Sequence, residues 1–291
     1  MKPVVARHTR PPGEGDWLPG VALGPAGVRR FRLYRPPDLQ RGERLPLLVM
    51  LHGCGQDAPS FAKSTRMNSL AARERFLVLY PEQDRLANPQ GCWNWFDKAS
   101  GRAEGEASLV MKAIDQVCLL HPADPSRVAV AGLSAGASLA ALLATMYPAR
   151  FQAVVMHSGI APGAGKALAS AKAAGRPPLL VIHGDADLLV APQHGLAAAK
   201  AWAATGGANE GPVRRVQRGQ RHPSAVTDFK RRGHLAATLV AVARLGHAWS
   251  GGAASQAFSD PKGPDASRML WSFVERCFRD RAGAGKQKPA A

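Results

Sequence analysis

The chain has 291 residues, and 46% of them are hydrophobic. This length and composition are typical of one large globular domain or two small ones, and they exclude a collagen-like or low-complexity chain. No run of about eighteen apolar residues occurs, so the sequence predicts no membrane-spanning helix. The formal net charge of +17 is far from ordinary and indicates a polyanionic partner, a strong counterion atmosphere, or both.

The first residues are polar and rich in proline, and we assign residues 1–27 to an N-terminal arm. This arm has no apolar segment of the kind that a secretory signal carries. We favour an extracytoplasmic mature form, from which a leader has been removed, over a cytoplasmic protein. After the arm, apolar and basic side chains intermix over 28–34, which predicts an edge strand with a basic outer face.

Short apolar runs alternate with segments of helical spacing along the rest of the chain. We predict strands at 45–51, 76–80, 128–133, 151–156, 179–182, 213–217 and 239–243. We predict helices at 60–75, 106–120, 135–147, 194–204 and 265–279. A long loop spans 82–103, an Ala/Gly/Lys-rich surface segment spans 162–177, and a disordered basic tail spans 281–291. This alternation predicts a single α/β domain over 28–280, built on a doubly wound, mostly parallel sheet.

The sequence Gly132-Leu133-Ser134-Ala135-Gly136 stands between a predicted strand and a predicted helix. The pattern G-x-S-x-G in this setting is typical of a nucleophile elbow. The two glycines permit a turn tight enough to lift the Ser134 hydroxyl above the carboxyl edge of the sheet. The N–H of Ala135 then points to where an oxyanion would form, next to the positive end of the helix. The alternative is an ordinary tight turn with a buried serine.

A serine nucleophile needs a general base, and the base needs an orienting acid. Asp187 follows one predicted strand and His247 follows another, which gives the order Ser, Asp, His of an α/β-hydrolase. Asp185 is the alternative acid; we favour Asp187 because the second acid of an H-G-x-x-D-x-x-V loop turns inward. His234 is the alternative base, and its basic neighbours indicate a surface position.

The strand at 45–51 leads directly into His52-Gly53-Cys54-Gly55-Gln56. The second N–H of an oxyanion hole comes from a loop of this kind, and we predict the N–H of Cys54. His52 and His183 each precede a glycine at a strand end, and we interpret both as hydrogen-bonded structural imidazoles.

Four cysteines occur, at positions 54, 92, 118 and 277. Cys54 and Cys92 lie in predicted active-site loops and can pair, whereas Cys118 and Cys277 lie in helical apolar patterns typical of a core. The absence of a C-x-x-C pair argues against a zinc or redox motif. The proposed chemistry needs no metal and no organic cofactor.

Four segments together carry a family resemblance: HGCGQ at 52–56, CWNWF at 92–96, GLSAG at 132–136 and GHAWSGG at 246–252. They resemble the poly(3-hydroxybutyrate) depolymerase family of α/β-hydrolases, over residues 28–255. The resemblance implies that Ser134, Asp187 and His247 form a catalytic triad. It also implies an aromatic substrate platform, which we carry onto Trp93, Trp95 and Trp249. The alternative for these tryptophans is core packing, and Trp95 fits either reading.

Basic residues cluster between 212 and 234, where seven arginines and lysines accompany one aspartate. A neutral polyester gains nothing from such a field, whereas several weak carboxylate contacts along a polyanion add up. We therefore expect Arg214, Arg215 and Arg218 to bind substrate, and we expect a serine hydrolase that depolymerises an anionic polymer, resembling the family's poly(aspartic acid) hydrolases. The alternative is a poly(3-hydroxybutyrate) depolymerase or short-chain carboxylesterase that uses the same residues.

The charge also permits two other interpretations. One is simple solubility or an arginine-rich coding bias. The other is a non-catalytic polyanion-binding protein on a vestigial hydrolase fold, but no recognised nucleic-acid motif occurs, and a lost activity would not preserve triad, oxyanion loop and aromatic loop together. We expect neither a specific nucleic acid nor a membrane as partner. The oligomeric state is left open, with a homodimer as one option.

Overall fold

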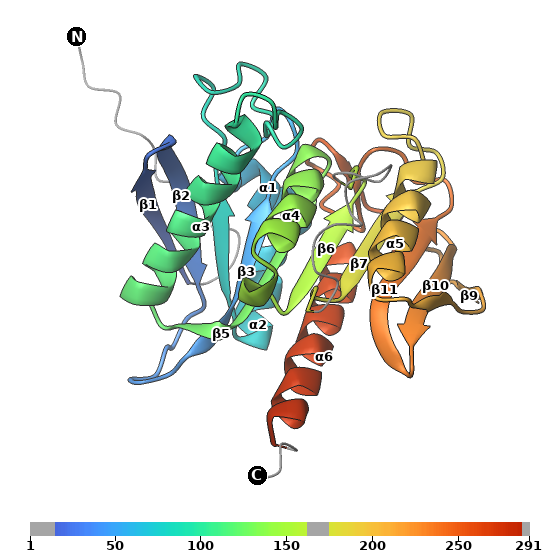
Figure 1. Cartoon of the computed structure of the whole chain (residues 1–291). Coiled ribbons are helices and arrows are strands. Elements are labelled where there is room, and N and C mark those ends of the chain that lie inside the picture. Colours follow the sequence, from blue (N-terminus) through green and yellow to red (C-terminus); the bar gives the residue numbers. More distant parts are fainter. Residues whose placement is uncertain (1–14, 162–174, 287–291) are drawn as a thin grey trace.

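The computed structural model describes residues 15–161 and 175–286, and it consists of one twisted sheet with helices on both faces (Figure 1). The α/β fold class predicted from the sequence is confirmed. The surface segment expected at 162–177 lies almost entirely outside the described residues, as do the first part of the expected N-terminal arm and the end of the expected tail.

The main sheet of the described residues has eleven strands in the order β1-β2-β4-β3-β5-β6-β7-β11-β10-β8, and β9 also pairs with β10. The strands from β4 to β11 in this order run parallel, and antiparallel strands flank them on both sides. The strands are β1 (Asp16–Gly24), β2 (Gly27–Arg35), β3 (Leu45–Leu51), β4 (Leu77–Pro81), β5 (Ala123–Leu133), β6 (Ala153–His157), β7 (Leu179–Gly184), β8 (Asn209–Glu210), β9 (Arg214–Val216), β10 (Ser224–Arg231) and β11 (His234–Val242), with a separate pair β12 (Trp249–Ser250) and β13 (Ser259–Asp260).

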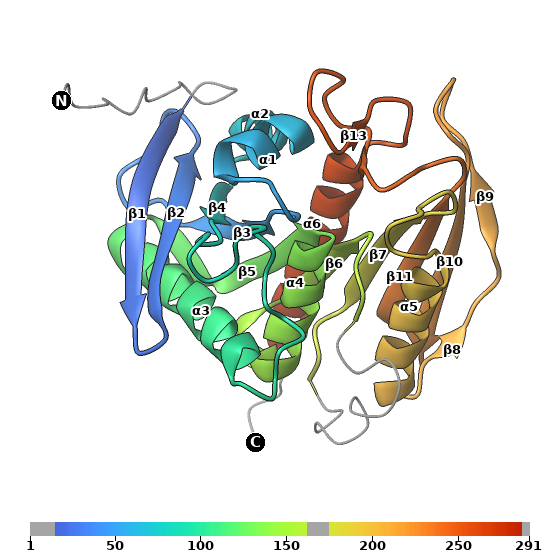
Figure 2. The ribbon, with the colours of Figure 1, turned by 90° about the horizontal axis from the view of Figure 1, so that it is seen from above.

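The helices cover the sheet in two layers, which the view from above separates clearly (Figure 2). The first layer contains α3, α4 and α5, and the second contains α1, α2 and α6. The helices are α1 (Ala58–Thr65), α2 (Met67–Glu74), α3 (Arg102–Leu120), α4 (Ala135–Met146), α5 (Gln193–Thr205) and α6 (Ala266–Lys286), with a 3₁₀ turn η1 (Pro148–Arg150) after α4.

The central strands are buried on both faces because helices cover both sides of the sheet. Every residue of β3 and of β7 is buried, as their continuous apolar sequences predict. The small side chains of α4 let this helix lie close to β5 and β6, and it is buried along most of its length. The parallel strands therefore end together at one rigid edge, where the loops that follow them meet.

The N-terminal segment differs from the sequence-based prediction. Part of the expected arm is strand β1, which pairs with β2 along its whole length, so β2 is not an edge strand. The expected basic outer face is also wrong at Arg29, which is 2% exposed and forms an ion pair with Glu106. A buried guanidinium is tolerated here because a carboxylate and carbonyl oxygens surround it.

Three other boundaries were misjudged from local patterns. The helix expected at 60–75 is two helices, because Arg66 adopts a left-handed conformation with φ 54° between them. The basic insertion before 239 contains strand β10, which forms a hairpin with a longer β11. Helix α6 continues to Lys286, into the region assigned to a disordered tail.

Candidate active site

Ser134 lies between β5 and α4, at the carboxyl edge of the sheet. Its backbone has φ 56° and ψ −122°, a strained conformation for a residue with a side chain. A Cβ on Gly132 would lie 2.3 Å from the backbone carbon of Gly136, and a Cβ on Gly136 would lie 2.2 Å from the Leu51 carbonyl oxygen. These backbone atoms leave no room for a side chain, so both positions require glycine, as the G-x-S-x-G pattern predicts.

Asp187 and His247 come together from the loops after β7 and β11. Nδ1 of His247 lies 2.8 Å from Oδ2 of Asp187, a hydrogen bond in which the imidazole donates. The other carboxylate oxygen accepts the N–H groups of Leu189 and Val190 at 3.0 and 2.9 Å. Burial raises the pKa of Asp187, but the hydrogen bonds from Val190 and His247 outweigh burial and hold this pKa below its usual value. The carboxylate is therefore ionised at neutral pH.

The two alternative residues lie elsewhere. Asp185 accepts the N–H of Arg244 at 2.6 Å and so joins two loops. His234 is the first residue of β11 and is exposed to solvent. The geometry agrees with the preference for Asp187 and His247 over these two.

His157, at the end of β6, connects the serine to the histidine loop, and the sequence analysis missed it. Its carbonyl accepts the N–H of Ser134 at 2.9 Å, and its Nε2 accepts the N–H of Ser250 at 3.1 Å. The ring is fully buried and stacks on Trp249 with centroids 5.0 Å apart. Burial, with smaller effects from His183 and His247, lowers the pKa of His157 to about 3, so the ring is neutral and free to accept. Its position at a strand end was the available signal.

The two histidines expected to be structural behave in that way. Nδ1 of His52 bonds the Gly53 carbonyl at 2.8 Å, and Nε2 accepts the N–H of Gln83 at 3.1 Å. Burial lowers the pKa of His52 to about 4. His183 donates to the Val190 carbonyl at 2.8 Å, and burial lowers its pKa too. Both imidazoles therefore fix loops at the carboxyl edge in their neutral form.

The loop after β3 lies beside the serine. A Cβ built on Gly53 would be 3.6 Å from Cβ of Ser134. The N–H of Cys54 has no acceptor among the described residues, and the N–H of Ala135 belongs to the first turn of α4, where N–H groups lack partners within a helix. Cys54 forms a disulfide with Cys92, which ties this loop to the long loop that contains the tryptophans.

A buried polar network holds the long loop on the sheet. Glu106 of α3 accepts Arg29 at 3.2 Å, Gln83 at 2.5 Å and Asn94 at 2.9 Å, and these four side chains are at most 8% exposed. Gln83 also donates to the Cys92 carbonyl at 2.9 Å. Cys92 is thus fixed both by its disulfide bond to Cys54 and by the hydrogen bond that its carbonyl accepts from Gln83. Nothing in the sequence indicated the roles of Gln83 and Glu106, because each is an ordinary polar residue in a different segment.

The aromatic platform expected from the family resemblance needs correction. Trp93 and Trp249 are fully buried, so the prediction that they bind substrate is wrong. The Trp93 indole donates to the His52 carbonyl at 2.9 Å, and the Trp249 indole donates to the Ser267 hydroxyl at 3.1 Å. Both indole rings are therefore part of the core and stabilise the loops of the site through these hydrogen bonds. Trp95 is only partly buried and packs edge-on against Phe96 with centroids 5.8 Å apart, so a binding role for Trp95 stays a prediction.

The three arginines expected to bind substrate do not gather around the candidate catalytic residues. Arg214 and Arg218 line a cavity on the α6 face whose lining includes none of the three predicted triad residues. Arg215 is exposed and does not line this cavity. A role for these arginines in substrate binding therefore stays a prediction.

In the described ranges, 15–161 and 175–286, no group of three or more His, Cys, Asp or Glu side chains is arranged to hold a metal ion. No helix there is both long and apolar enough to cross a membrane.

A strained serine at a strand-to-helix turn, with an aspartate–histidine pair from later strands, on this strand order, defines an α/β-hydrolase. Solved structures support the fold. An acetyl xylan esterase from Aspergillus awamori superimposes with a TM-score of 0.68 at 19% identity, over 80% of this chain and 94% of that one. A ferulic acid esterase superimposes with a TM-score of 0.61 at 14% identity, over 91% and 99% of the two chains.

Sequence comparison identifies the family. The model described as Esterase PHB depolymerase matches residues 29–195, and the chain belongs to this family, which makes it an enzyme of the serine hydrolase class. The chain is 39% identical to Poly(3-hydroxyalkanoate) depolymerase C of Paucimonas lemoignei over 41% of its own length and 28% of the relative's length. It is 30% identical to Feruloyl esterase B of Neurospora crassa over 61% of its own length and 70% of the relative's.

These relatives bear on the expected reaction. Their names describe enzymes that cleave esters, and acetylxylan esterase A of Emericella nidulans is a further example, at 24% identity over 72% of this chain and 78% of that one. The comparisons thus support ester cleavage, which was the alternative in the sequence analysis. They do not support the poly(aspartic acid) hydrolase that the charge suggested.

Proposed function

We propose that the chain is a serine esterase in which Ser134 is the nucleophile, His247 the general base and Asp187 the residue that orients it. The observation that carries this proposal is the 2.8 Å hydrogen bond between His247 and Asp187, together with the strained Ser134. His157 strengthens it, because this one residue bonds both to Ser134 and to the segment that follows His247.

In the proposed reaction, Nε2 of His247 takes the hydroxyl proton of Ser134 while Oγ forms a bond to the ester carbonyl carbon. The carbonyl oxygen becomes an oxyanion, which the N–H groups of Ala135 and Cys54 stabilise. The tetrahedral intermediate collapses, the bond to the alcohol breaks, and His247 returns its proton to the leaving alcohol. Water then attacks the acyl-enzyme with His247 as base again, and the carboxylic acid is released from Ser134.

The surroundings of Asp187 favour an apolar substrate. Leu188 and Leu189, which follow it directly, are 95% and 72% exposed. Apolar side chains at this level of exposure, beside a candidate catalytic residue, are typical of surfaces that bind a ligand. Together with the named relatives, they support esters of short hydroxyalkanoic or aromatic acids as the substrate class. The positive charge keeps an anionic polymer as a second candidate.

The disulfide between Cys54 and Cys92 supports an extracytoplasmic location. Such bonds persist in oxidising compartments and are rare where glutathione keeps thiols reduced. Its place in the oxyanion loop ties the proposed activity to that environment.

The test compares wild type with Ser134→Ala on three substrates: a p-nitrophenyl ester, 3-hydroxybutyrate oligomers and poly(aspartic acid). The proposal expects wild type to cleave the esters and the variant to lose at least about 10³-fold in kcat. Variant activity within about tenfold of wild type would overturn the serine mechanism. Cleavage of poly(aspartic acid) with no cleavage of either ester would overturn the substrate class and leave the mechanism standing.

A further inference from the structure

A cavity of about 750 Å³ lies between α6 and the β9–β11 end of the sheet. It is on the face of the sheet that α6 covers, and its lining contains none of the residues proposed for ester hydrolysis. Six arginines line it, against two aspartates: Arg66, Arg214, Arg218, Arg221, Arg268 and Arg276. Volumes of this size are typical of small-molecule sites.

The cavity exists because α6 does not reach the edge of the sheet. This helix packs on β6 and β7, while β11 and β10 continue beyond it, adding roughly 10 Å of sheet at about 4.8 Å per strand. The floor is therefore a strip of apolar sheet and helix whose side chains are buried or partly buried. Its residues are Leu180, Val226, Val240, Met269 and Phe273.

Four of the six arginines already have protein partners. Arg214 pairs with Asp228 at 3.0 Å, and Arg268 pairs with Asp265 at 3.7 Å. Arg221 donates to the Gly263 carbonyl at 2.6 Å, and Arg66 donates to a carbonyl of the loop after β12. Two of these four are paired with a carboxylate and two donate to carbonyl oxygens, so all four already use part of their hydrogen-bonding capacity within the protein.

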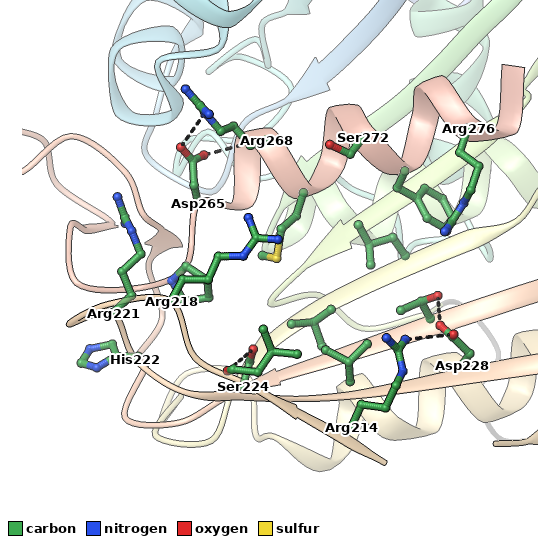
Figure 3. A pocket seen from close by; sticks show the side chains of 18 of the residues that line it. Arg214, Arg218, Arg221, His222, Ser224, Asp228, Asp265, Arg268, Ser272 and Arg276 are labelled. Atoms are coloured by element: carbon green, nitrogen blue, oxygen red, sulfur yellow. Dashed lines mark hydrogen bonds and ion pairs between the residues drawn. The ribbon is translucent and has the colours of Figure 1, made fainter. Parts of the chain in front are cut away.

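The other two arginines have neither a carboxylate nor a carbonyl partner for their side chains among the described residues. Arg218 extends from the segment between β9 and β10 toward α6 (Figure 3). Arg276 lies over the ring of Phe273, 5.6 Å from the centroid, at the α6 side. A guanidinium that crosses an apolar floor without an acceptor is placed to receive an anion from outside the protein.

We infer that this cavity binds an organic acid, with its carboxylate on Arg218 and its apolar body on the floor formed by Val226, Val240, Met269 and Phe273. A single acid group fits because only Arg218 and Arg276 are uncommitted, and Arg276 already uses one face on an aromatic ring. An apolar body is expected because apolar side chains line the floor, and ligand pockets with such a lining hold apolar groups. The site is separate from the triad and does not depend on ester hydrolysis.

The test is a calorimetric titration of the full-length protein with sodium octanoate, and with 1-octanol as the neutral counterpart. Octanoate is expected to bind saturably at one site and at least about tenfold more tightly than octanol, because only the acid can pair with Arg218. Arg218→Gln should weaken octanoate binding by at least about tenfold. Arg232→Gln is the matched control, since Arg232 is an exposed arginine between β10 and β11 that does not line the cavity, and it should change binding by less than about twofold.

Ser134→Ala separates this inference from the proposed hydrolysis. Octanoate is the product acid of an ester, so it can also occupy the catalytic site. The inference requires that binding persists when Ser134→Ala protein is first saturated with a non-hydrolysed ester analogue. Loss of binding under that competition, equal binding of octanol, or equal effects of Arg218→Gln and Arg232→Gln would each overturn it.

Discussion

The carboxyl edge of the sheet and the cavity beside α6 both gather charged side chains, but they hold them differently. At the edge, Asp187 is 2% exposed and Glu106 is 4% exposed, and each carboxylate accepts two or more hydrogen bonds. In the cavity, the ion pair of Arg214 with Asp228 is 58% and 22% exposed, and Arg218 has no acceptor among the described residues.

The buried charges at the edge act through fixed hydrogen bonds, whereas the exposed charges of the cavity act through their electrostatic field. A buried charge must have its partners in place, so single atoms at the edge fix the orientation of His247 and the loops around it. Exposed arginines attract anions, and each alone contributes little to the stability of the fold. The edge is therefore expected to be intolerant of single substitutions, and the cavity tolerant.

The largest expected effect is that of Asp187→Asn. An amide at this position favours the wrong imidazole tautomer, so kcat should fall by about 10³–10⁴-fold with little change in KM. Steady-state hydrolysis of a p-nitrophenyl ester measures this. Asp185→Asn is the control, because Asp185 accepts only a loop N–H and should cost less than about tenfold. Equal losses in the two variants would show that Asp187 has no special role.

Glu106→Ala should have the largest effect on stability. It leaves the Arg29 guanidinium buried without its carboxylate, which typically costs about 3–5 kcal/mol. Urea unfolding followed by tryptophan fluorescence measures the loss. The double replacement Arg29→Met with Glu106→Leu removes both charges and should recover part of the stability, because Gln83 and Asn94 still lose an acceptor. If the double variant is as unstable as Glu106→Ala, packing rather than the unpaired charge is responsible.

The sequence alone predicts those parts of these regions whose structure is decided by a clear local pattern. The buried strands β3 and β7 and the elbow were predictable because their signals, continuous apolar runs and two required glycines, are local. The β1–β2 hairpin was not, because Pro19 and Gly20 obscure the strand pattern of β1. The break at Arg66 was not, because a single left-handed residue decides it.

The same distinction applies to the site. The order of Ser134, Asp187 and His247 can be read from the chain, but the buried partners that hold them cannot. His157 acts on Ser250 from 93 residues away, and its sequence context is that of any strand end. Trp93 and Trp249 were misassigned because loop composition indicated exposure, whereas each indole finds a buried acceptor in a distant segment.

Breaking the disulfide tests how far the edge depends on covalent support. Cys92→Ser frees Cys54, and we expect kcat to fall by about tenfold because the oxyanion N–H loses its fixed position. Mass spectrometry after alkylation should find Cys118 free and the pair protected in the native protein. Cys118→Ser is the matched control and should leave kcat unchanged. Free thiols at both 54 and 92 in the native protein would contradict the bond.

The buried imidazoles predict a pH dependence of stability. Burial lowers the pKa of His157 to about 3 and that of His52 to about 4, whereas an unfolded chain protonates both near about pH 6.5. Because the unfolded state takes up these protons first, the melting temperature should fall as the pH drops from about 6.5 toward about 4. His157→Gln should flatten this slope, and His234→Gln, at an exposed position, should not. An unchanged slope in the His157 variant would assign the acid sensitivity to other groups.

The smallest expected effect is that of Arg214→Gln, which breaks the same kind of pair as Glu106→Ala, but on the surface. Asp228 keeps its hydrogen bond from the Thr238 hydroxyl at 2.8 Å and lies 3.5 Å from the Lys230 ammonium, so no charge is left unsatisfied. Urea unfolding should therefore show a loss of less than about 1 kcal/mol, and less still in high salt. A loss comparable to that of Glu106→Ala would mean that exposed and buried pairs support this fold equally, which the burial of the two pairs does not predict.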